Sequence, residues 1–421
     1  MAKRTVKIPV SSLRKGLYVS RLDRPWVETP FLFQGFEIQT DEELAQLREL
    51  CGAVYVDMTA SEAEQLEGRG PSKKPAAAPS DSAKVLASMA ANPAGNLGSV
   101  PLKDPVVLKS ELHAAKRIYG ESKKAMNALF DRLRRGGSLD VSLIGEVADS
   151  MIDSILRNRE AMGWLAQMKS KDDYLYGHSL ATSVWALAFG RHLGLDRTTL
   201  RSVAVGAMLL DIGKTKIPTA LLHKSQPLDS ADLSTLHGHV ELGLEVVEGD
   251  VRADECVKTM IRTHHERLDG SGYPAGLAGD AIPFAGRIAG IVDCYDAMTS
   301  ERIYARGKST YEAVQELKKL GNKWFQPELV ELFIQAVGVF PTGSLVELSS
   351  GEVGVVIAQN RFRRLRPEVM VILDPQKQVR ADFAVVDLQT YDSNESDGRG
   401  LWITRGLDPG AYNIDPAEYF L

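Results

Sequence analysis

The chain has few cysteines, no basic block and no long apolar run. Its three cysteines lie far apart, at Cys51, Cys256 and Cys294, and none belongs to a CxxC pair. This pattern argues against a disulfide framework and a thiolate zinc site, and it favours a reducing, cytoplasmic location. A net charge of −5 without basic runs argues against nonspecific binding of DNA or RNA polymers.

Apolar residues make up 44% of the chain, but no stretch approaches the length of a membrane helix. The basic segment from Met1 to Lys7 is likewise not followed by an apolar run of signal-peptide length. We therefore expect no integral membrane segment. With 421 residues the chain is too long for one compact core, so two or three domains are expected.

Changes in composition and periodicity divide the chain into four parts. Residues 1–65 combine strand-like runs with a helix that begins after Thr40 and predict a small α+β N-terminal domain. Residues 66–104 are rich in Pro, Gly, Ser and Ala, as flexible linkers are. Residues 105–337 repeat apolar side chains at helical spacing and predict a multi-helix domain. Residues 338–421 change to β-type runs and predict a small β-rich module, so the expected fold class is mainly α.

The most informative segment reads HHERLDGSGYP and runs from His264 to Pro274. Neutral imidazole is the commonest protein ligand of transition metals, so two adjacent histidines indicate a metal site. The glycines and the proline of the same segment favour a tight loop beside it. A second segment, LLDIGK at residues 209–214, supports this interpretation, and together the two segments predict a metal-dependent phosphohydrolase.

All eight histidines fall within the predicted helical domain. For four of them we expect a structural or merely exposed role, as is usual for a lone helical histidine: His113, His192, His223 and His237. The other four occur in motifs together with two aspartates. The candidate metal ligands are therefore His178, Asp211, His239, His264, His265 and Asp293.

The order of these motifs resembles the HD-GYP family of cyclic-di-GMP phosphodiesterases, a branch of the HD metal-dependent phosphohydrolases. The resemblance covers about residues 140–335. It is carried by YLYGHS at 174–179, LLDIGK, HVELG at 239–243, HHERLDGSGYP and RIAGIVDCYDAMTS at 287–300. The N-terminal part resembles a small uncharacterised domain that often precedes HD-GYP domains.

The resemblance implies metal ions, iron or manganese, bridged by the carboxylate of Asp211. Two such ions activate a water and neutralise the oxygens of a phosphodiester. One metal would be held by His178, the residue before Asp211, Asp211 itself and Asp293, and the other by Asp211, His239, His264 and His265. Tyr174 stands where family members with a third metal have glutamate, so at most two ions are expected.

The resemblance also implies which residues meet the substrate. Asp211 and Lys214 would be catalytic, with the lysine contacting a phosphate oxygen or assisting as an acid. Substrate contacts would come from Lys214, Gly272, Tyr273, Pro274, Asp296 and Arg302. For Tyr273 two interpretations stay open: the ring binds substrate or a partner protein, or the segment is only a rigid turn.

One position departs from the family pattern. The histidine that precedes the aspartate in the family is Leu210 here, and leucine cannot bind a metal. Either water completes a weaker but active centre, or the first metal is lost and water activation is lost with it. The expected number of ions is therefore one or two.

Two functions from different classes follow. The first is a phosphodiesterase that hydrolyses cyclic-di-GMP to pGpG, with GMP left open as a further product, in bacterial second-messenger signalling. The second is a catalytically impaired module that binds cyclic-di-GMP or docks a protein partner through the Gly-Tyr-Pro loop. The complete Gly-Tyr-Pro motif disfavours a mononucleotide hydrolase. Leu210 favours the impaired module, but the retained ligand and phosphate-facing residues favour the enzyme, which we expect.

Overall fold

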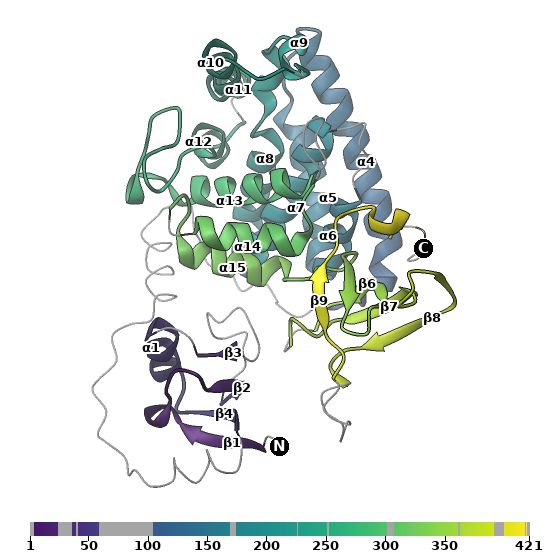
Figure 1. The fold of residues 1–421 in the computed structure, drawn as a ribbon. Coiled ribbons are helices and arrows are strands. Elements are labelled where there is room, and N and C mark those ends of the chain that lie inside the picture. The colour runs from purple at the N-terminus through teal and green to yellow at the C-terminus, as the bar shows by residue number, and fades with distance from the viewer. Residues whose placement is uncertain are drawn as a thin grey trace.

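The structure is a computed structural model in which three parts of the chain are distinct: an N-terminal α+β unit, a central helical domain and a C-terminal sheet (Figure 1). None of the helices in the described ranges is long and apolar enough to cross a membrane. We describe residues 4–23, 36–38, 41–58, 104–168, 174–224, 226–250, 252–300, 307–321, 323–360, 363–390, 400–416 and 418.

The N-terminal unit is an antiparallel sheet with one helix. Its strands are β1 (Arg4–Pro9), β2 (Tyr18–Leu22), β3 (Phe36–Glu37) and β4 (Ala53–Met58), in the spatial order β1-β4-β2-β3, and its helix is α1 (Asp41–Leu50). Val54 and Val56 of β4 are fully buried, as the two-residue period of a strand with one face on a core requires. The buried residues of this unit form a core of their own.

The helical domain begins with α4 (Leu108–Arg134), α5 (Val141–Arg157) and α6 (Arg159–Gln167). Side chains cap two of these helices: Asp140 accepts hydrogen bonds at the start of α5, and Asn158 does so at the start of α6. The remaining helices are α7 (Tyr174–His192), α8 (Arg197–Leu209), α9 (Thr219–Leu222), α10 (Ser230–His237), α11 (His239–Glu248), α12 (Glu255–Thr263), α13 (Phe284–Thr299), α14 (Thr310–Leu320) and α15 (Pro327–Val337).

Helix α7 lies at the centre of this domain. Every residue from His178 to Arg191 is buried, and α7 packs against α6, α8, α13 and α15. A helix without a solvent-facing side is stable only when other helices surround it. This position places His178 inside the domain rather than on its surface.

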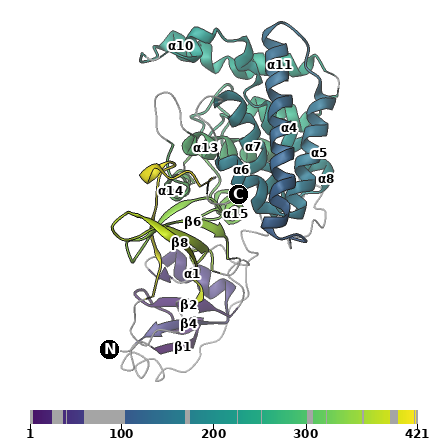
Figure 2. The same ribbon diagram turned by 90° about the vertical axis from the view of Figure 1, so that its right-hand side faces the viewer.

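The C-terminal module is an antiparallel sheet that packs against the helices (Figure 2). Its strands are β5 (Leu345–Leu348), β6 (Val353–Ala358), β7 (Glu368–Leu373), β8 (Val379–Asp387) and β9 (Ile403–Gly406), in the order β8-β7-β6-β5-β9. Val346 and Val356 belong to the same core as the helices. The Thr342 hydroxyl donates to Glu160 at 2.7 Å, and Gln167 Nε2 donates to the Thr342 carbonyl at 2.9 Å.

The predicted fold class, mainly α with a small mixed unit before the helices and a β-rich module after them, is confirmed. The strands expected near residues 53–57 and 369–373 are β4 and β7. The sequence pattern does not predict β8, because most of its side chains are exposed and show no apolar alternation. Most of the predicted linker and the N-cap at Thr40 lie outside the described residues. The domain boundaries stay predictions.

Candidate metal centre

The six candidate ligands come from different elements of the helical domain and lie together in its interior. His178 is in α7, Asp211 directly precedes the 3-10 helix η4 (Ile212–Lys216), His239 begins α11, His264 and His265 follow α12, and Asp293 is in α13. All but His265 are at most 7% exposed, and His265 is partly exposed. Polar side chains this deeply buried need partners, so their convergence demands a chemical explanation.

A glycine permits two of the ligand-bearing segments to meet. A Cβ atom on Gly213 would lie 1.9 Å from the backbone oxygen of His239 and 2.5 Å from the backbone nitrogen of Gly243. Only glycine therefore allows η4 to pack directly on the first turn of α11. This contact brings the carboxylate of Asp211 to the imidazole of His239.

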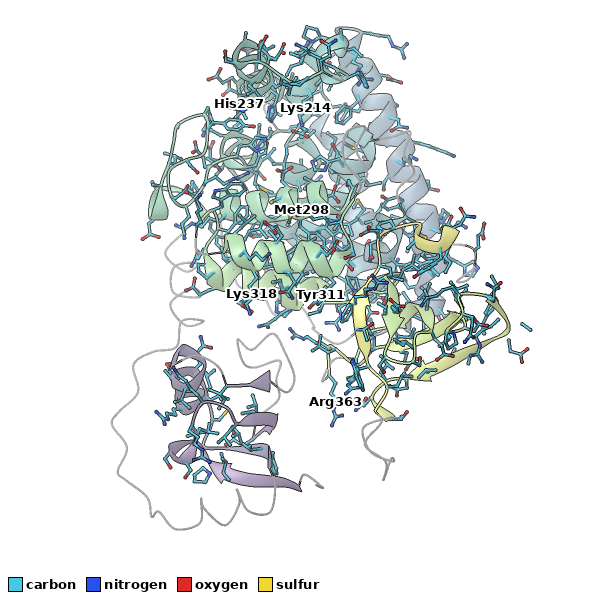
Figure 3. The ribbon with its side chains drawn as sticks, viewed as in Figure 1. Lys214, His237, Met298, Tyr311, Lys318 and Arg363 are labelled. Carbon is cyan, nitrogen blue, oxygen red and sulfur yellow. The ribbon has the colours of Figure 1, made fainter. Side chains whose placement is uncertain are left out.

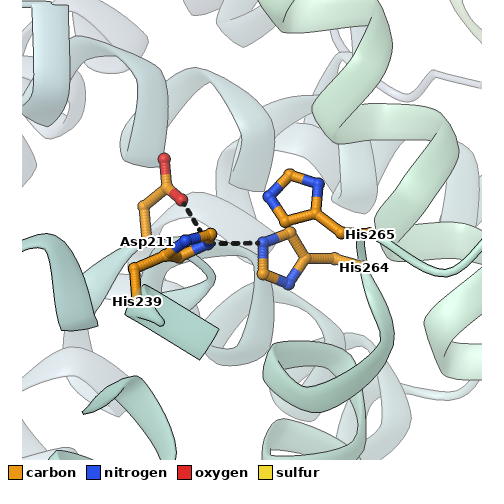
Figure 4. A group of neighbouring side chains, drawn as sticks. All are labelled: Asp211, His239, His264 and His265. Atoms are coloured by element: carbon orange, nitrogen blue, oxygen red, sulfur yellow. Dashed lines mark hydrogen bonds and ion pairs between the residues drawn. The ribbon is translucent and has the colours of Figure 1, made fainter. Parts of the chain in front are cut away.

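Four of the candidate ligands form one compact group, Asp211, His239, His264 and His265 (Figure 4). One ligand atom from each lies within 4.8 Å of all the others. His239 Nε2 is 3.2 Å from His264 Nε2 and 3.4 Å from Asp211 Oδ1. Ligand bonds of about 2.0–2.2 Å at tetrahedral angles put neighbouring donor atoms roughly 3.3–3.6 Å apart, so these spacings suit a shared cation.

Backbone carbonyls orient two of these imidazoles. His239 Nδ1 lies 2.7 Å from the Leu236 carbonyl oxygen, and His264 Nδ1 lies 2.8 Å from the Ile261 carbonyl oxygen. A carbonyl only accepts, so both Nδ1 atoms donate and both Nε2 lone pairs point into the group. Asp211 Oδ1 is also buried without a hydrogen-bond donor among the described residues. Facing lone pairs and an unpaired carboxylate oxygen fit a divalent metal ion.

His178 lies between Asp293 and the second carboxylate oxygen of Asp211, within 4 Å of both. His178 Nε2 is 3.0 Å from Asp293 Oδ1 and 3.6 Å from Asp211 Oδ2. The second half of the site therefore has three donor residues from the predicted set. At the position of the fourth ligand stands Leu210, which is 1% exposed and belongs to the apolar core.

Asp296 is placed differently from the substrate contact predicted for it. Its side chain is fully buried, and Oδ2 lies 2.7 Å from His178 Nδ1 while Oδ1 accepts from Trp185 Nε1 at 3.0 Å. The Ser300 hydroxyl also donates to Oδ2 at 3.1 Å. The carboxylate thus orients the ring of His178 through its Nδ1 atom. Because it is fully buried, it presents no exposed surface to a substrate.

Burial and charge set the protonation of the site. Burial lowers the pKa of His239 to about 4 and also lowers the pKa values of His264 and His265, so all three are neutral near pH 7. For Asp211, burial alone would raise the pKa, but the positive charges of Lys214 and His178 outweigh it and hold the pKa well below its usual range. Burial would lower the pKa of His178, yet hydrogen bonds to Asp293 and Asp296 raise it to about 9.

The Gly-Tyr-Pro loop lies directly against the histidines. The ring of Tyr273 stacks on His265 on one side and on His237 on the other, and Pro274 is exposed. We expected a structural or merely exposed role for His237, although its position two residues before His239 was a signal that it lies near the site. Lys214 and His237 are drawn at the α10–α11 end of the helical domain in Figure 3. Arg302, the last predicted substrate contact, lies outside the described residues.

Comparison with known proteins agrees with this geometry. Residues 159–329 match the HD domain family, and residues 5–144 match a domain of unknown function (DUF3391). A cyclic di-GMP phosphodiesterase of Pseudomonas aeruginosa is 31% identical over 384 residues, which cover 91% of this chain and 88% of that protein. A cyclic di-GMP phosphodiesterase response regulator of Xanthomonas campestris is 31% identical over 213 residues, 48% of this chain and 56% of that protein.

A third relative acts on a different cyclic dinucleotide. A 3'3'-cGAMP-specific phosphodiesterase of Vibrio cholerae is 30% identical over 198 residues, 47% of this chain and 38% of that protein. The fold and the histidine–aspartate group define an HD-domain protein. Within that class, the chain belongs to the HD-GYP family of cyclic-di-GMP phosphodiesterases, as its motifs predict.

Proposed function

We propose that the protein is a metal-dependent phosphodiesterase that hydrolyses cyclic-di-GMP to pGpG, with GMP as the product of a second hydrolysis. The observation that carries this proposal is the compact group of Asp211, His239, His264 and His265 beside the ammonium of Lys214. The names of three relatives, all phosphodiesterases of cyclic dinucleotides, support the substrate class.

The four clustered residues would hold the metal ion. When bound, a divalent ion there supplies positive charge for the phosphoryl oxygens and lowers the pKa of a water. Lys214 is partly exposed, and its Nζ lies 2.5 Å from Asp211 Oδ2. Its ammonium is therefore placed to donate to an oxygen of a phosphate bound next to the ion.

We propose that one ion, iron or manganese, is held tightly by the four-residue group. A second ion would have His178, Asp211 and Asp293 but no fourth protein ligand, because Leu210 offers none. Its affinity is then lower, and its occupancy depends on the metal concentration supplied. We further propose a cytoplasmic protein whose Gly-Tyr-Pro loop, with Pro274 exposed, is available to protein partners.

The alternative is an impaired module that binds cyclic-di-GMP without cleaving it, and the observation that favours it is Leu210. Anaerobic preparation with Mn²⁺ or Fe²⁺, metal counting and chromatography of the products separate the two. The enzyme proposal predicts pGpG formation that His264→Ala abolishes. Binding of cyclic-di-GMP with no product at any metal loading would favour the module. Parallel assays with 3'3'-cGAMP define the preferred substrate.

A further inference from the structure

The three histidines of the metal-binding group are not held in the same way. The rings of His239 and His264 are fixed by hydrogen bonds from Nδ1 to backbone carbonyls. Across the described part of the chain, the ring of His265 makes no hydrogen bond, and its nearest carboxylate, Asp293 Oδ2, is 4.0 Å from Nδ1. A ligand without such support can rotate about its side-chain bonds, which weakens metal binding.

Stacking replaces the missing hydrogen bond. The Tyr273 and His265 ring centroids are 4.6 Å apart, and their planes are inclined by 28°. On its opposite face Tyr273 stacks on His237, with a centroid distance of 3.8 Å and an angle of 13°. The three rings form a continuous stack, which we call the Tyr273 stack, running from the exposed His237 to the ligand His265.

The Gly-Tyr-Pro loop is built to keep Tyr273 in this place. The backbone N–H of Tyr273 donates to the His265 carbonyl at 3.2 Å. A Cβ atom on Gly272 would lie 2.4 Å from the same carbonyl oxygen, so glycine is needed for this close approach. Beyond the tyrosine, the buried carboxylate of Glu266 accepts from Ala275 N and Leu277 N, each at 2.8 Å.

We propose that Tyr273 and His237 are positioning residues that fix the imidazole of His265 for metal binding. The inference rests on the proposed metal centre and deepens it. It assigns a physical role to the Gly-Tyr-Pro motif in this chain, and it gives His237 a role that a lone helical histidine does not suggest. Because both faces of the tyrosine ring are covered, a guanine base cannot stack on Tyr273 without displacing one of the histidines.

The test uses Co²⁺ as the probe, because its visible absorption reports ligand number and geometry independently of turnover. The full-length protein is titrated with Co²⁺ as wild type and as Tyr273→Ala, Tyr273→Phe, His237→Ala and His237→Phe. We expect Tyr273→Ala to weaken Co²⁺ binding by about 10–100-fold, the usual cost of losing support for a ligand, and to change the spectrum. Tyr273→Phe keeps the stack and should retain the wild-type affinity and spectrum.

His237→Ala is the second test, because it leaves the Gly-Tyr-Pro loop unchanged. It should weaken Co²⁺ binding in the same direction but less than Tyr273→Ala, and His237→Phe should restore it. Circular dichroism checks that each variant is folded. Unchanged affinity and spectrum in folded Tyr273→Ala, or equal losses in Tyr273→Ala and Tyr273→Phe, would overturn the inference. Wild-type protein that binds no Co²⁺ would instead overturn the proposed metal centre.

Discussion

Oδ2 of Asp211 lies 2.5 Å from the ammonium of Lys214, whereas Oδ1 of the same carboxylate lies 3.4 Å from Nε2 of His239. One side chain therefore joins the four-residue metal-binding group to the half of the site that contains His178. Lys214 therefore places a positive charge beside Oδ2 of Asp211. By the family pattern this is the side of the first metal, whose fourth ligand is missing because residue 210 is leucine.

Replacing Lys214 tests this charge directly. Lys214→Met should lower kcat for cyclic-di-GMP by about 100-fold, the usual cost of one preorganised charge at a reacting phosphate, while the tightly bound metal is retained. Lys216→Met is the matched control, because this neighbouring lysine is exposed. Equal kcat values for the two variants would remove Lys214 from the chemistry. Steady-state rates and metal analysis of the same preparations provide the measurement.

Restoring a histidine at residue 210 should increase metal binding. Leu210→His adds an imidazole beside Asp211, so the count should rise towards two ions per chain at a metal concentration that leaves the wild type with about one. The buried leucine makes apolar contacts that histidine loses, so a stability cost of about 1–3 kcal/mol is expected. Leu210→Ala disturbs the same core without adding a ligand and should leave the metal count unchanged. An unchanged count in folded Leu210→His contradicts the ligand argument.

The pKa values of two histidines predict a stability maximum for the metal-free protein. Folding lowers the pKa of His239 from 6.5 to about 4, so the unfolded chain binds more protons between these values and stability falls as the pH drops below about 6.5. Folding raises the pKa of His178 to about 9, so stability falls as the pH rises from 6.5 to 9. Urea unfolding across this range should show the maximum near pH 6.5.

Replacing Asp296 tests whether His178 causes the loss of stability above pH 6.5. Because its carboxylate is one of the groups that raise the pKa of His178, Asp296→Asn should shift this pKa down and flatten the loss of stability above pH 6.5. An unaltered slope in this variant would mean that another group titrates there. Nuclear magnetic resonance of the His178 ring measures the pKa directly.

Gly272→Ala should displace the loop that carries Tyr273. The added Cβ would approach backbone atoms of His265, Glu266 and Arg267 to about 2.5 Å, and overpacking of this kind costs about 1–3 kcal/mol. Gly120→Ala in α4 is a suitable control, since its Cβ meets nothing within 4 Å. Only the first variant should be destabilised in urea and bind Co²⁺ more weakly; equal behaviour of the two would contradict the packing argument.

The sequence was sufficient to predict which residues come together, because each candidate ligand stands in a short recognisable motif; their role as metal ligands stays a prediction. The Tyr273 stack could not be predicted, since it depends on how α10 and the Gly-Tyr-Pro loop approach each other in space. Asp296 was predicted as a substrate contact, but its spacing of three residues from Asp293 on one helix places both carboxylates on the face that holds His178. Its hydrogen-bond partners, which a motif does not reveal, show that Asp296 contacts Nδ1 of His178 and Nε1 of Trp185.

The most direct test of the account is the rate of pGpG formation from cyclic-di-GMP by anaerobically prepared protein, measured against its bound metal. The account predicts that product forms in proportion to the ion held by Asp211, His239, His264 and His265, and that His264→Ala loses both metal and product. Metal-loaded wild-type protein that forms no pGpG, or a His264→Ala variant that forms it at the wild-type rate, would contradict it.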